Sequence, residues 1–175
     1  MKLSNFLKNA AISLALAVTS SAAQPTNHVE MHTMSSTPDN REILDFPPPM
    51  REHMLRNMRS HFEAINEIIL ALSVSNGAEA AKIARTKLSL ESVNAAACDP
   101  KQATKGGAMN DMAQMMARHM PEEVRALGYA MHESAGQFAL EAEKLKTNGD
   151  PRPSLAALAK TTEHCATCHA AYRLK

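Results

Sequence analysis

The C-terminal stretch His164-Cys165-Ala166-Thr167-Cys168-His169 is the feature from which the rest of the chain is interpreted. Two cysteines separated by two residues and followed directly by a histidine form the attachment signature of a c-type haem. The two thiols are spaced to add to the two vinyl groups of one porphyrin, and the histidine is placed to bind the iron. The sequence therefore predicts one covalent haem c, bonded to Cys165 and Cys168, with His169 as an iron ligand.

Three other kinds of site also use a Cys-x-x-Cys pair. A thioredoxin-like redox site requires a βαβ context, which the sequence does not indicate. A structural zinc site draws on a second pair of ligands, and the third cysteine of the chain, Cys98, stands alone in the sequence. A disulfide between Cys165 and Cys168 would leave His169 without a role. The haem interpretation gives a role to all three residues.

Apolar residues recur at three- and four-residue steps, which predicts amphipathic helices. The expected helices cover about 50–75, 78–97 and 121–147, with a short one at 109–119 and a final one that carries Leu155 to Tyr172. On the final helix the haem signature shares the apolar stripe. No strand pattern is found. Four long helices joined by three connections predict an all-α, up-down-up-down antiparallel four-helix bundle over residues 49–175, with the covalently bound haem near the C-terminus.

The N-terminal residues 1–23 have the pattern of a secretory signal peptide: lysines, a short apolar run and then small residues. Residues 24–48 read as an exposed, flexible lead-in rich in turn residues. The apolar run is too short to cross a bilayer, so we expect an exported, periplasmic protein without membrane insertion. Without residues 1–23 the chain has 17 basic and 18 acidic side chains. This balance does not suggest a nucleic-acid partner.

The C-terminal run Cys165-Ala-Thr-Cys168-His169-Ala-Ala-Tyr172-Arg173 resembles the class II c-type cytochromes, the cytochrome c-prime family, over roughly residues 50–175. Arg51-Glu52 stands where that family often has Arg-Gln. The resemblance implies a haem inside the bundle with His169 as the proximal ligand. It also implies one of two states: a five-coordinate iron that binds gases, or a low-spin electron carrier ligated by a methionine of the first helix. The absence of Trp, His164 before Cys165 and the long 98–120 crossover depart from the family pattern.

The distal ligand is ranked by counting along the helices. If the first and last helices are antiparallel neighbours, counting fifteen residues back from about Val74 puts His169 level with Arg59, so the iron would be level with Met58, at 1.5 Å per residue. Met58 is then the first candidate for the sixth ligand, Met54 the second and His61 the third. A gapless match to five-coordinate relatives instead places Leu55 over the iron. A methionine stripe that only packs the core is the remaining alternative.

Several other residues receive weaker assignments. Arg51 and Arg173 either pair with the haem propionates or are solvated surface charges, and Tyr172 is expected to pack against the haem edge. Cys98 is either buried or bridges a homodimer. Two methionine- and histidine-containing groups could bind Cu(I) or could simply pack: His28, Met31, His32 and Met34, and Met109, Met112, Met115, Met116, His119 and Met120.

The function expected from these features is that of a periplasmic monohaem cytochrome that carries single electrons between redox proteins. A thioether ligand favours ferrous iron, which suits this role. The alternative is a five-coordinate protein that binds NO or CO, with Leu55 on the distal side. No nucleophile–base pair or phosphate-binding loop appears, so an enzyme is not expected. The sequence leaves the redox partners, the reduction potential and the oligomeric state open.

Overall fold

The structure, a computed structural model, describes residues 38–99, 110–146 and 149–175. Asp39–Lys175 forms one compact unit. The predicted signal peptide, the first part of the lead-in, the group from His28 to Met34, and Met109 lie outside the described residues.

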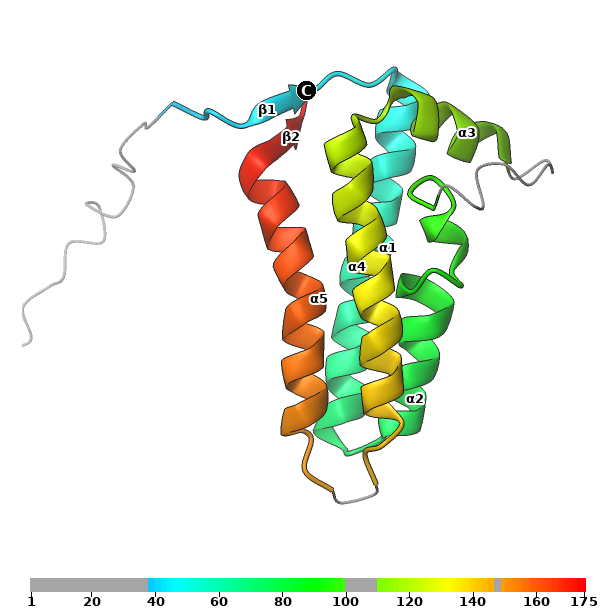
Figure 1. Ribbon diagram of the computed structural model, residues 1–175, viewed down its shortest axis with the longest axis vertical. Coiled ribbons are helices and arrows are strands. Elements are labelled where there is room, and N and C mark those ends of the chain that lie inside the picture. The colour runs from blue at the N-terminus through cyan, green and yellow to red at the C-terminus, as the bar shows by residue number, and fades with distance from the viewer. Residues whose placement is uncertain (1–37, 100–109, 147–148) are drawn as a thin grey trace, which may run out of the picture. The chain divides into compact units, whose positions relative to one another are not determined.

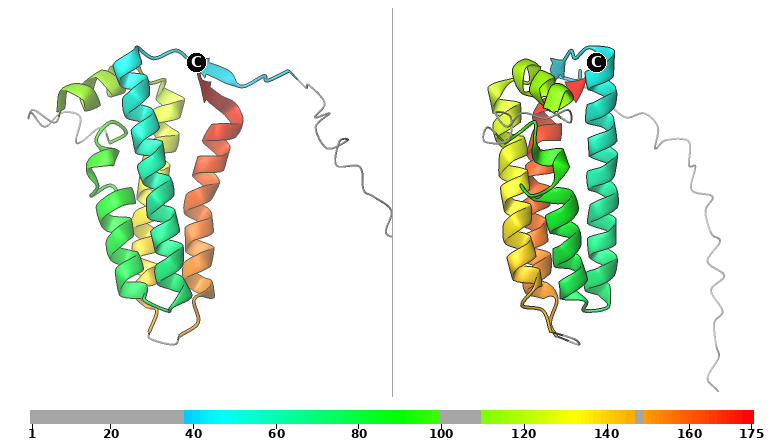
Figure 2. Two further views of the ribbon diagram at one scale, coloured as in Figure 1. Left: turned by 180° about the vertical axis from the view of Figure 1, so that it is seen from behind. Right: turned by 90° about the vertical axis from the view of Figure 1, so that its right-hand side faces the viewer.

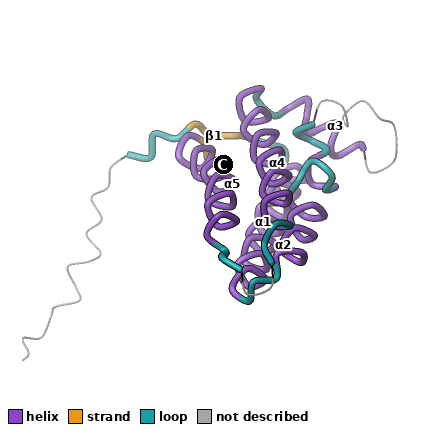
Figure 3. The backbone as a smooth tube through the Cα atoms, turned by 60° about the horizontal axis from the view of Figure 1, so that its bottom comes forward, coloured by secondary structure: helices purple, strands orange, loops and turns teal. Residues whose placement is uncertain are grey.

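The described residues are mostly helical, as the all-α prediction requires (Figures 1 and 3). Followed by colour in Figure 1, α1 and α4 run in one direction and α2 and α5 in the other. A π-helical turn continues α2, and two short strands accompany the helices. The helices are α1 (Pro48–Ser73), α2 (Gly77–Ile83), α3 (Asn110–His119), α4 (Glu122–Ala142) and α5 (Arg152–Ala171), with the π-helix at Ala84–Leu88, a 3-10 turn at Val93–Ala95, and strands β1 (Glu42–Leu44) and β2 (Tyr172–Leu174).

Prolines begin the helices α1, α4 and α5. Pro47 and Pro121 are the N-terminal cap residues of α1 and α4, and Pro151 is that of α5. A proline in the first turn costs no hydrogen bond, because the first N–H groups of a helix have no intrahelical partner. Asn76 caps α2 by accepting a hydrogen bond from the Glu79 backbone N–H at 3.1 Å.

The turn between α1 and α2 requires a glycine because of a close approach rather than because of a positive φ. Ser75, not Gly77, has the positive φ, at 53°. A Cβ on Gly77 would lie 2.1 Å from the Ala142 carbonyl oxygen and 2.7 Å from Leu145 Cβ. Glycine therefore allows the start of α2 to approach the end of α4 closely.

The prediction of a second helix over 78–97 is wrong beyond Leu88. Its last regular hydrogen bonds are those of the π-turn, in which the Ser89 N–H donates to the Ala84 carbonyl at 2.7 Å. The Ser89 hydroxyl then donates to the Arg85 carbonyl and accepts from the Glu91 N–H. A serine side chain that satisfies backbone groups in this way competes with the helix, and the chain becomes extended at Ser89.

The lead-in is not exposed throughout, and the chain has strands that the sequence pattern did not predict. β1 pairs in parallel with β2, with Glu42 opposite Tyr172 and Leu44 opposite Leu174. Leu44 and Phe46 are buried. Three residues are too short to show an alternating pattern, so the signal for this pair was absent from either segment alone. The N-terminal segment is thereby fixed beside the C-terminus.

The helices of this unit pack unequally. α4 has its most extensive contact with α5, and α2 packs against both α1 and α4, whereas α1 and α5 approach each other at few points. Figure 2 shows the same helices from behind and from one side.

The apolar core is divided into two clusters. The large cluster joins α1, α2, α4 and α5 and includes Ala64, Ile68, Leu72, Leu88, Phe138 and Leu158. The capping cluster joins β1, α3 and the starts of α1 and α4, and includes Leu44, Phe46, Met50, Met116, Met120 and Val124. Met131 is buried but belongs to neither cluster. The core of the described unit is therefore discontinuous near the middle of α4.

Candidate functional site

The inward stripe of α5 carries both cysteines of the motif. Ser154, Leu158 and Thr161 are buried on this stripe, and Cys165 and Cys168 follow at the same helical spacing and are half-buried. Both are free thiols, so the structure holds no disulfide between them. The Cys165 thiol donates to the Thr161 carbonyl at 3.8 Å, and burial raises the pKa of both thiols. The pair therefore points toward the bundle interior in the protonated form.

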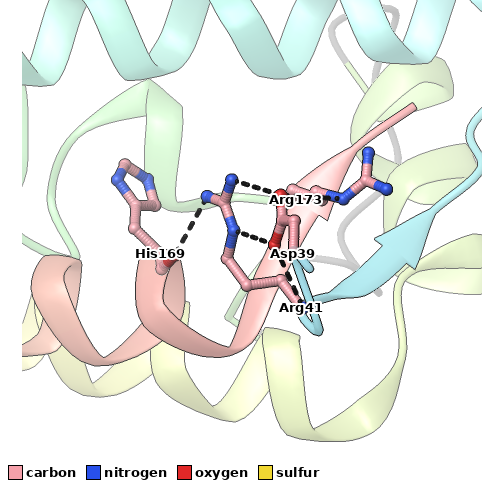
Figure 4. A network of polar contacts seen from close by, with 4 residues as sticks. All are labelled: Asp39, Arg41, His169 and Arg173. Atoms are coloured by element: carbon pink, nitrogen blue, oxygen red, sulfur yellow. Dashed lines mark hydrogen bonds and ion pairs between the residues drawn. The ribbon is translucent and has the colours of Figure 1, made fainter. Parts of the chain in front are cut away.

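His169 lies on a different side of α5 from Cys168. Its side chain is exposed, and Figure 4 shows the imidazole projecting from α5 on the side where α1 crosses the view, away from α4. His169 contacts Arg41 through its backbone: the His169 carbonyl accepts a hydrogen bond from Arg41 at 3.3 Å. The motif thus directs two thiols toward the interior and one imidazole toward the space beside α1.

Helix α1 presents an exposed apolar flank. Phe62 is 74% exposed, Ile69 47% and Leu55 40%, and these residues are seven apart, so they lie in one row. On the opposite flank of α1, Glu67 pairs with Lys87 of the π-helix at 2.5 Å. The flank of α1 that faces α2 and the π-helix is therefore not the apolar one. The apolar flank, defined as Leu55, Met58, Phe62, Ile65 and Ile69, therefore faces the α5 side of α1.

Two cross-helix contacts fix the register of α5 against α1. The rings of His61 and His132 are 5.3 Å apart, and the Ser134 hydroxyl lies 3.2 Å from that of Thr161. Because α1 and α4 run in the same direction, Thr161 is level with a residue about two positions after His61. Counting back along antiparallel α1 puts His169 level with about Leu55, roughly 6 Å from the expected level of Arg59.

The expected register was wrong because the helix ends were misplaced. α5 begins at Arg152 rather than near Ser154, and α1 ends at Ser73 rather than near Val74. If Ser73 and Arg152 are taken as level with each other, counting along the two helices puts His169 close to the level of Leu55, as the cross-helix contacts do. Side chains in a helix lean toward its N-terminus. The side chain of Met58 therefore leans along α1 toward the level of His169, and the side chain of His169 leans along α5 toward the level of Met58. The side chain of Met54 leans away from that level.

A layer that contains His61, His132 and Met131 lies between the two apolar clusters: the two imidazole rings contact each other, and none of the three side chains belongs to either cluster. His61 is 6% exposed and His132 1% exposed. His132 Nδ1 donates to the Leu88 carbonyl at 2.5 Å, whereas His61 Nε2 is buried with no hydrogen-bond partner among the described residues. Burial lowers the pKa of both imidazoles, that of His61 to about 4. Both rings are therefore neutral near pH 7, and each has one nitrogen that carries no proton.

Met54 and Tyr172 are engaged elsewhere. Both pack against the capping cluster, and Tyr172 belongs to strand β2 rather than to a continuation of α5. The helix ends at Ala171 because Tyr172 has extended backbone angles, φ −126° and ψ 152°. The expectation that the final helix includes Tyr172 is therefore wrong.

The two arginines assigned to propionates make contacts within the protein. Arg51 donates to the Lys175 carbonyl at 3.2 Å, and Arg173 Nε lies 3.2 Å from an Asp39 carboxylate oxygen. Asp39 is also held by Arg41, which the sequence reasoning missed because residues 39–41 gave no motif. Figure 4 shows Asp39, Arg41 and Arg173 beside the last turn of α5.

The methionines of α3 do not converge on one point. Met116 and Met120 are buried in the capping cluster, whereas Met115 is exposed on the helix surface. His119 Nδ1 donates to the Met115 carbonyl at 2.9 Å. Within the described part of the chain there is also no group of three or more His, Cys, Asp or Glu side chains that could hold a metal ion. Of the described methionines in this group, Met112, Met116 and Met120 pack in or against the capping cluster.

Cys98 is packed inside the unit. A Cβ on Gly128 of α4 would lie 2.5 Å from Cys98 Sγ, so this glycine makes room for the thiol. Burial, and then the nearby Cys168 thiol, raise the pKa of Cys98 to about 11. Of the two sequence alternatives for Cys98, packing against α4 is what the structure contains.

The arrangement fits a flat apolar group that needs soft ligands. Cys165 and Cys168 supply thiols, His169 supplies an imidazole beside α1, and the apolar flank of α1 supplies a hydrophobic wall with Met58 on it. His61 Nε2, which has no hydrogen-bond partner among the described residues, lies in the layer where the apolar core is discontinuous. These residues therefore fit a covalently bound haem between α1 and α5.

The described helices include none that is both long and apolar enough to cross a membrane. Comparison of the chain with protein-family models, curated proteins and solved structures finds no match.

Proposed function

We propose that this chain is a monohaem c-type cytochrome that carries single electrons between redox proteins. The observation that carries the proposal is the arrangement of α5 against α1. Both thiols of the motif lie on the inward stripe of α5, and His169 projects toward the side on which α1 exposes Leu55, Phe62 and Ile69. Exposed apolar rows of this kind mark a binding surface.

The residues of the chain have separate roles in this proposal. Cys165 and Cys168 hold one haem c through thioether bonds, and His169 is the proximal ligand. Met58 is the distal ligand, because it leans toward the level of His169 from the apolar flank. Met54 is a weaker candidate because it already packs in the capping cluster. Leu55 and Phe62 exclude water from the space between α1 and α5.

A bound haem supplies an iron that gains and loses one electron. His169 and Met58 would hold the iron, and a methionine ligand would raise its reduction potential. The polypeptide adds these two side chains and an apolar wall, and we propose no catalytic turnover.

The wider proposal follows the sequence resemblance. It assigns the chain to the class II c-type cytochromes, with an up-down-up-down four-helix bundle and export to the periplasm through residues 1–23. The support is the C-terminal position of the motif, the alternating direction of the long helices and the signal-like N-terminus. Redox proteins are the proposed partners. A homodimer is not required by any contact described above.

The test is the absorption spectrum of the purified protein and of two matched variants. We expect a low-spin ferric spectrum with a methionine–iron band, which Met58→Leu abolishes and Met54→Leu retains. Covalent haem should persist in both variants. A high-spin wild-type spectrum with rapid CO binding to the ferrous form would contradict the electron-carrier proposal. That result would favour the gas-binding alternative, in which Leu55 of the apolar flank covers the distal side.

A further inference from the structure

The segment Asp39–Asp45, named the strap here, lies along the C-terminal end of α5. Its strand β1 pairs with β2, which directly follows the haem motif. At its far end Lys175 Nζ pairs with Asp45 at 2.9 Å. Arg41 of the strap and His169 of the motif are 128 positions apart in sequence, so these contacts are tertiary and specific to the folded chain.

The strap contacts the peptide of the proposed iron ligand. The last four carbonyls of a helix have no intrahelical donor. At the end of α5 the Tyr172 N–H donates to the Cys168 carbonyl, and the chain then turns into β2. The His169 carbonyl would next receive the N–H of Arg173 if the helix continued. Arg41 Nη1 donates to it instead, at 3.3 Å.

Asp39 holds the Arg41 guanidinium in place for this contact. Arg41 Nε donates to Asp39 Oδ1 at 2.9 Å and Nη2 donates to Oδ2 at 2.8 Å, a two-pronged pair that fixes the plane of the guanidinium. Arg173 Nε lies 3.2 Å from the same Oδ2 atom. The strap and β2 are thus joined through one carboxylate at the point where α5 ends, as Figure 4 shows.

We propose that the strap is a clamp on the last turn of α5 and that Arg41 is a positioning residue for His169. This inference rests on the proposed function, in which His169 binds the iron. The side chain of His169 is exposed, and the described structure gives its imidazole no hydrogen bond that would orient it. The orientation of the ligand therefore depends on its backbone, which Arg41 holds at the carbonyl. Groups that orient a metal ligand tune the metal site without touching the metal.

The test compares Arg41→Gln with Arg41→Lys and with a control, Arg56→Gln. Lysine keeps the positive charge but lacks the planar fork, so it cannot bridge Asp39 and the His169 carbonyl in the same way. Arg56 is an exposed arginine of α1 whose ion pair, at 4.0 Å to Glu52, stays within that helix. The three variants thus separate the bridge from its charge and from general effects of removing an arginine.

The first measurement does not depend on haem. Hydrogen exchange of the amides at 172–175 should become about 3- to 10-fold faster in both Arg41 variants, because the contact that closes the end of α5 is lost. Exchange should be unchanged in Arg56→Gln. Equal exchange in wild type and Arg41→Gln would overturn the clamp, and wild-type exchange in Arg41→Lys would show that charge rather than the bridge is responsible.

The second measurement uses the haem-loaded protein. Both Arg41 variants should retain covalent haem, but their ferric spectra should show an increased high-spin fraction, which Arg56→Gln should not. Faster exchange with an unchanged spectrum and an unchanged reduction potential would overturn the positioning role. Absence of covalent haem in the wild-type protein would refute the proposed function instead, and with it the positioning role, whereas the exchange data would still decide whether the clamp exists.

Discussion

Acidification should destabilise the protein because of two buried histidines. His61 and His132 contact each other between the two apolar clusters, and burial lowers the pKa of each imidazole. In the unfolded chain both titrate near 6.5. Between pH 6.5 and about 4 the unfolded chain therefore binds protons that the folded chain does not. The full contribution of the two neutral histidines to the unfolding free energy is present above pH 6.5. This contribution is lost as the pH falls toward 4, and the loss stops below the pKa that His61 has in the folded protein.

The size of this loss follows from the pKa of His61, which burial lowers from 6.5 to about 4. A difference of one pKa unit corresponds to roughly 1.4 kcal/mol, so His61 accounts for about 3 kcal/mol of unfolding free energy between pH 7 and pH 4. His132 acts in the same direction. A loss of this size is a large part of the stability of an ordinary domain, which is about 5–15 kcal/mol.

The assay is urea unfolding, followed by far-ultraviolet circular dichroism at several pH values between 7 and 4. The readout is the change in unfolding free energy with pH within each protein, so a variant that is less stable at pH 7 remains informative. His61→Leu should remove most of the pH dependence. His119→Gln is the matched control, because His119 lies on the exposed surface of α3, and it should leave the dependence intact. If His61→Leu keeps the wild-type pH dependence, the account of the buried layer is wrong.

Three further predictions concern packing. Gly77→Ala should lower the unfolding free energy by about 1–3 kcal/mol, because the added methyl group meets the end of α4. Gly136→Ala, inside α4, should stabilise the protein by roughly 0.5–1 kcal/mol, because the added methyl group meets only Ser89 Cβ, at an ordinary 3.9 Å; thermal unfolding measures both. Phe138→Ala should cost about 3–5 kcal/mol in a urea titration, because this side chain is 1% exposed in the large cluster. Phe62→Ala should shift the reduction potential of the haem-loaded protein and Leu140→Ala, on α4, should not; equal shifts would contradict the assignment of the apolar flank.

Much of the helical structure could be predicted from local signals. Pro47 and Pro121, next to apolar periodicity, indicate the starts of α1 and α4, and the three–four spacing puts Cys165 on the inward stripe of α5. The same spacing puts His169 on that stripe, which is wrong, because its side chain is exposed. These features depend on a few neighbouring residues, which is why a single sequence contains them.

The parts that sequence reasoning missed depend on contacts between distant residues. The β1–β2 pair joins segments that each have three residues, and Arg41 acquires its role only when the strap meets the end of α5. The end of the second helix at Leu88 depends on the hydroxyl of Ser89, a residue that is also tolerated inside helices. The register of α1 against α5 was wrong by about one turn, because small errors in two helix ends add.

The central claim is that a haem is bonded to Cys165 and Cys168, and the mass of the intact protein tests it most directly. The protein should be produced in a host that attaches c-type haem to exported chains, with Cys165→Ser, Cys168→Ser as the paired control. The account predicts that the denatured wild-type polypeptide is heavier than its amino acids by one haem and that the doubly substituted chain is not. A wild-type mass equal to that of the processed polypeptide alone would contradict it.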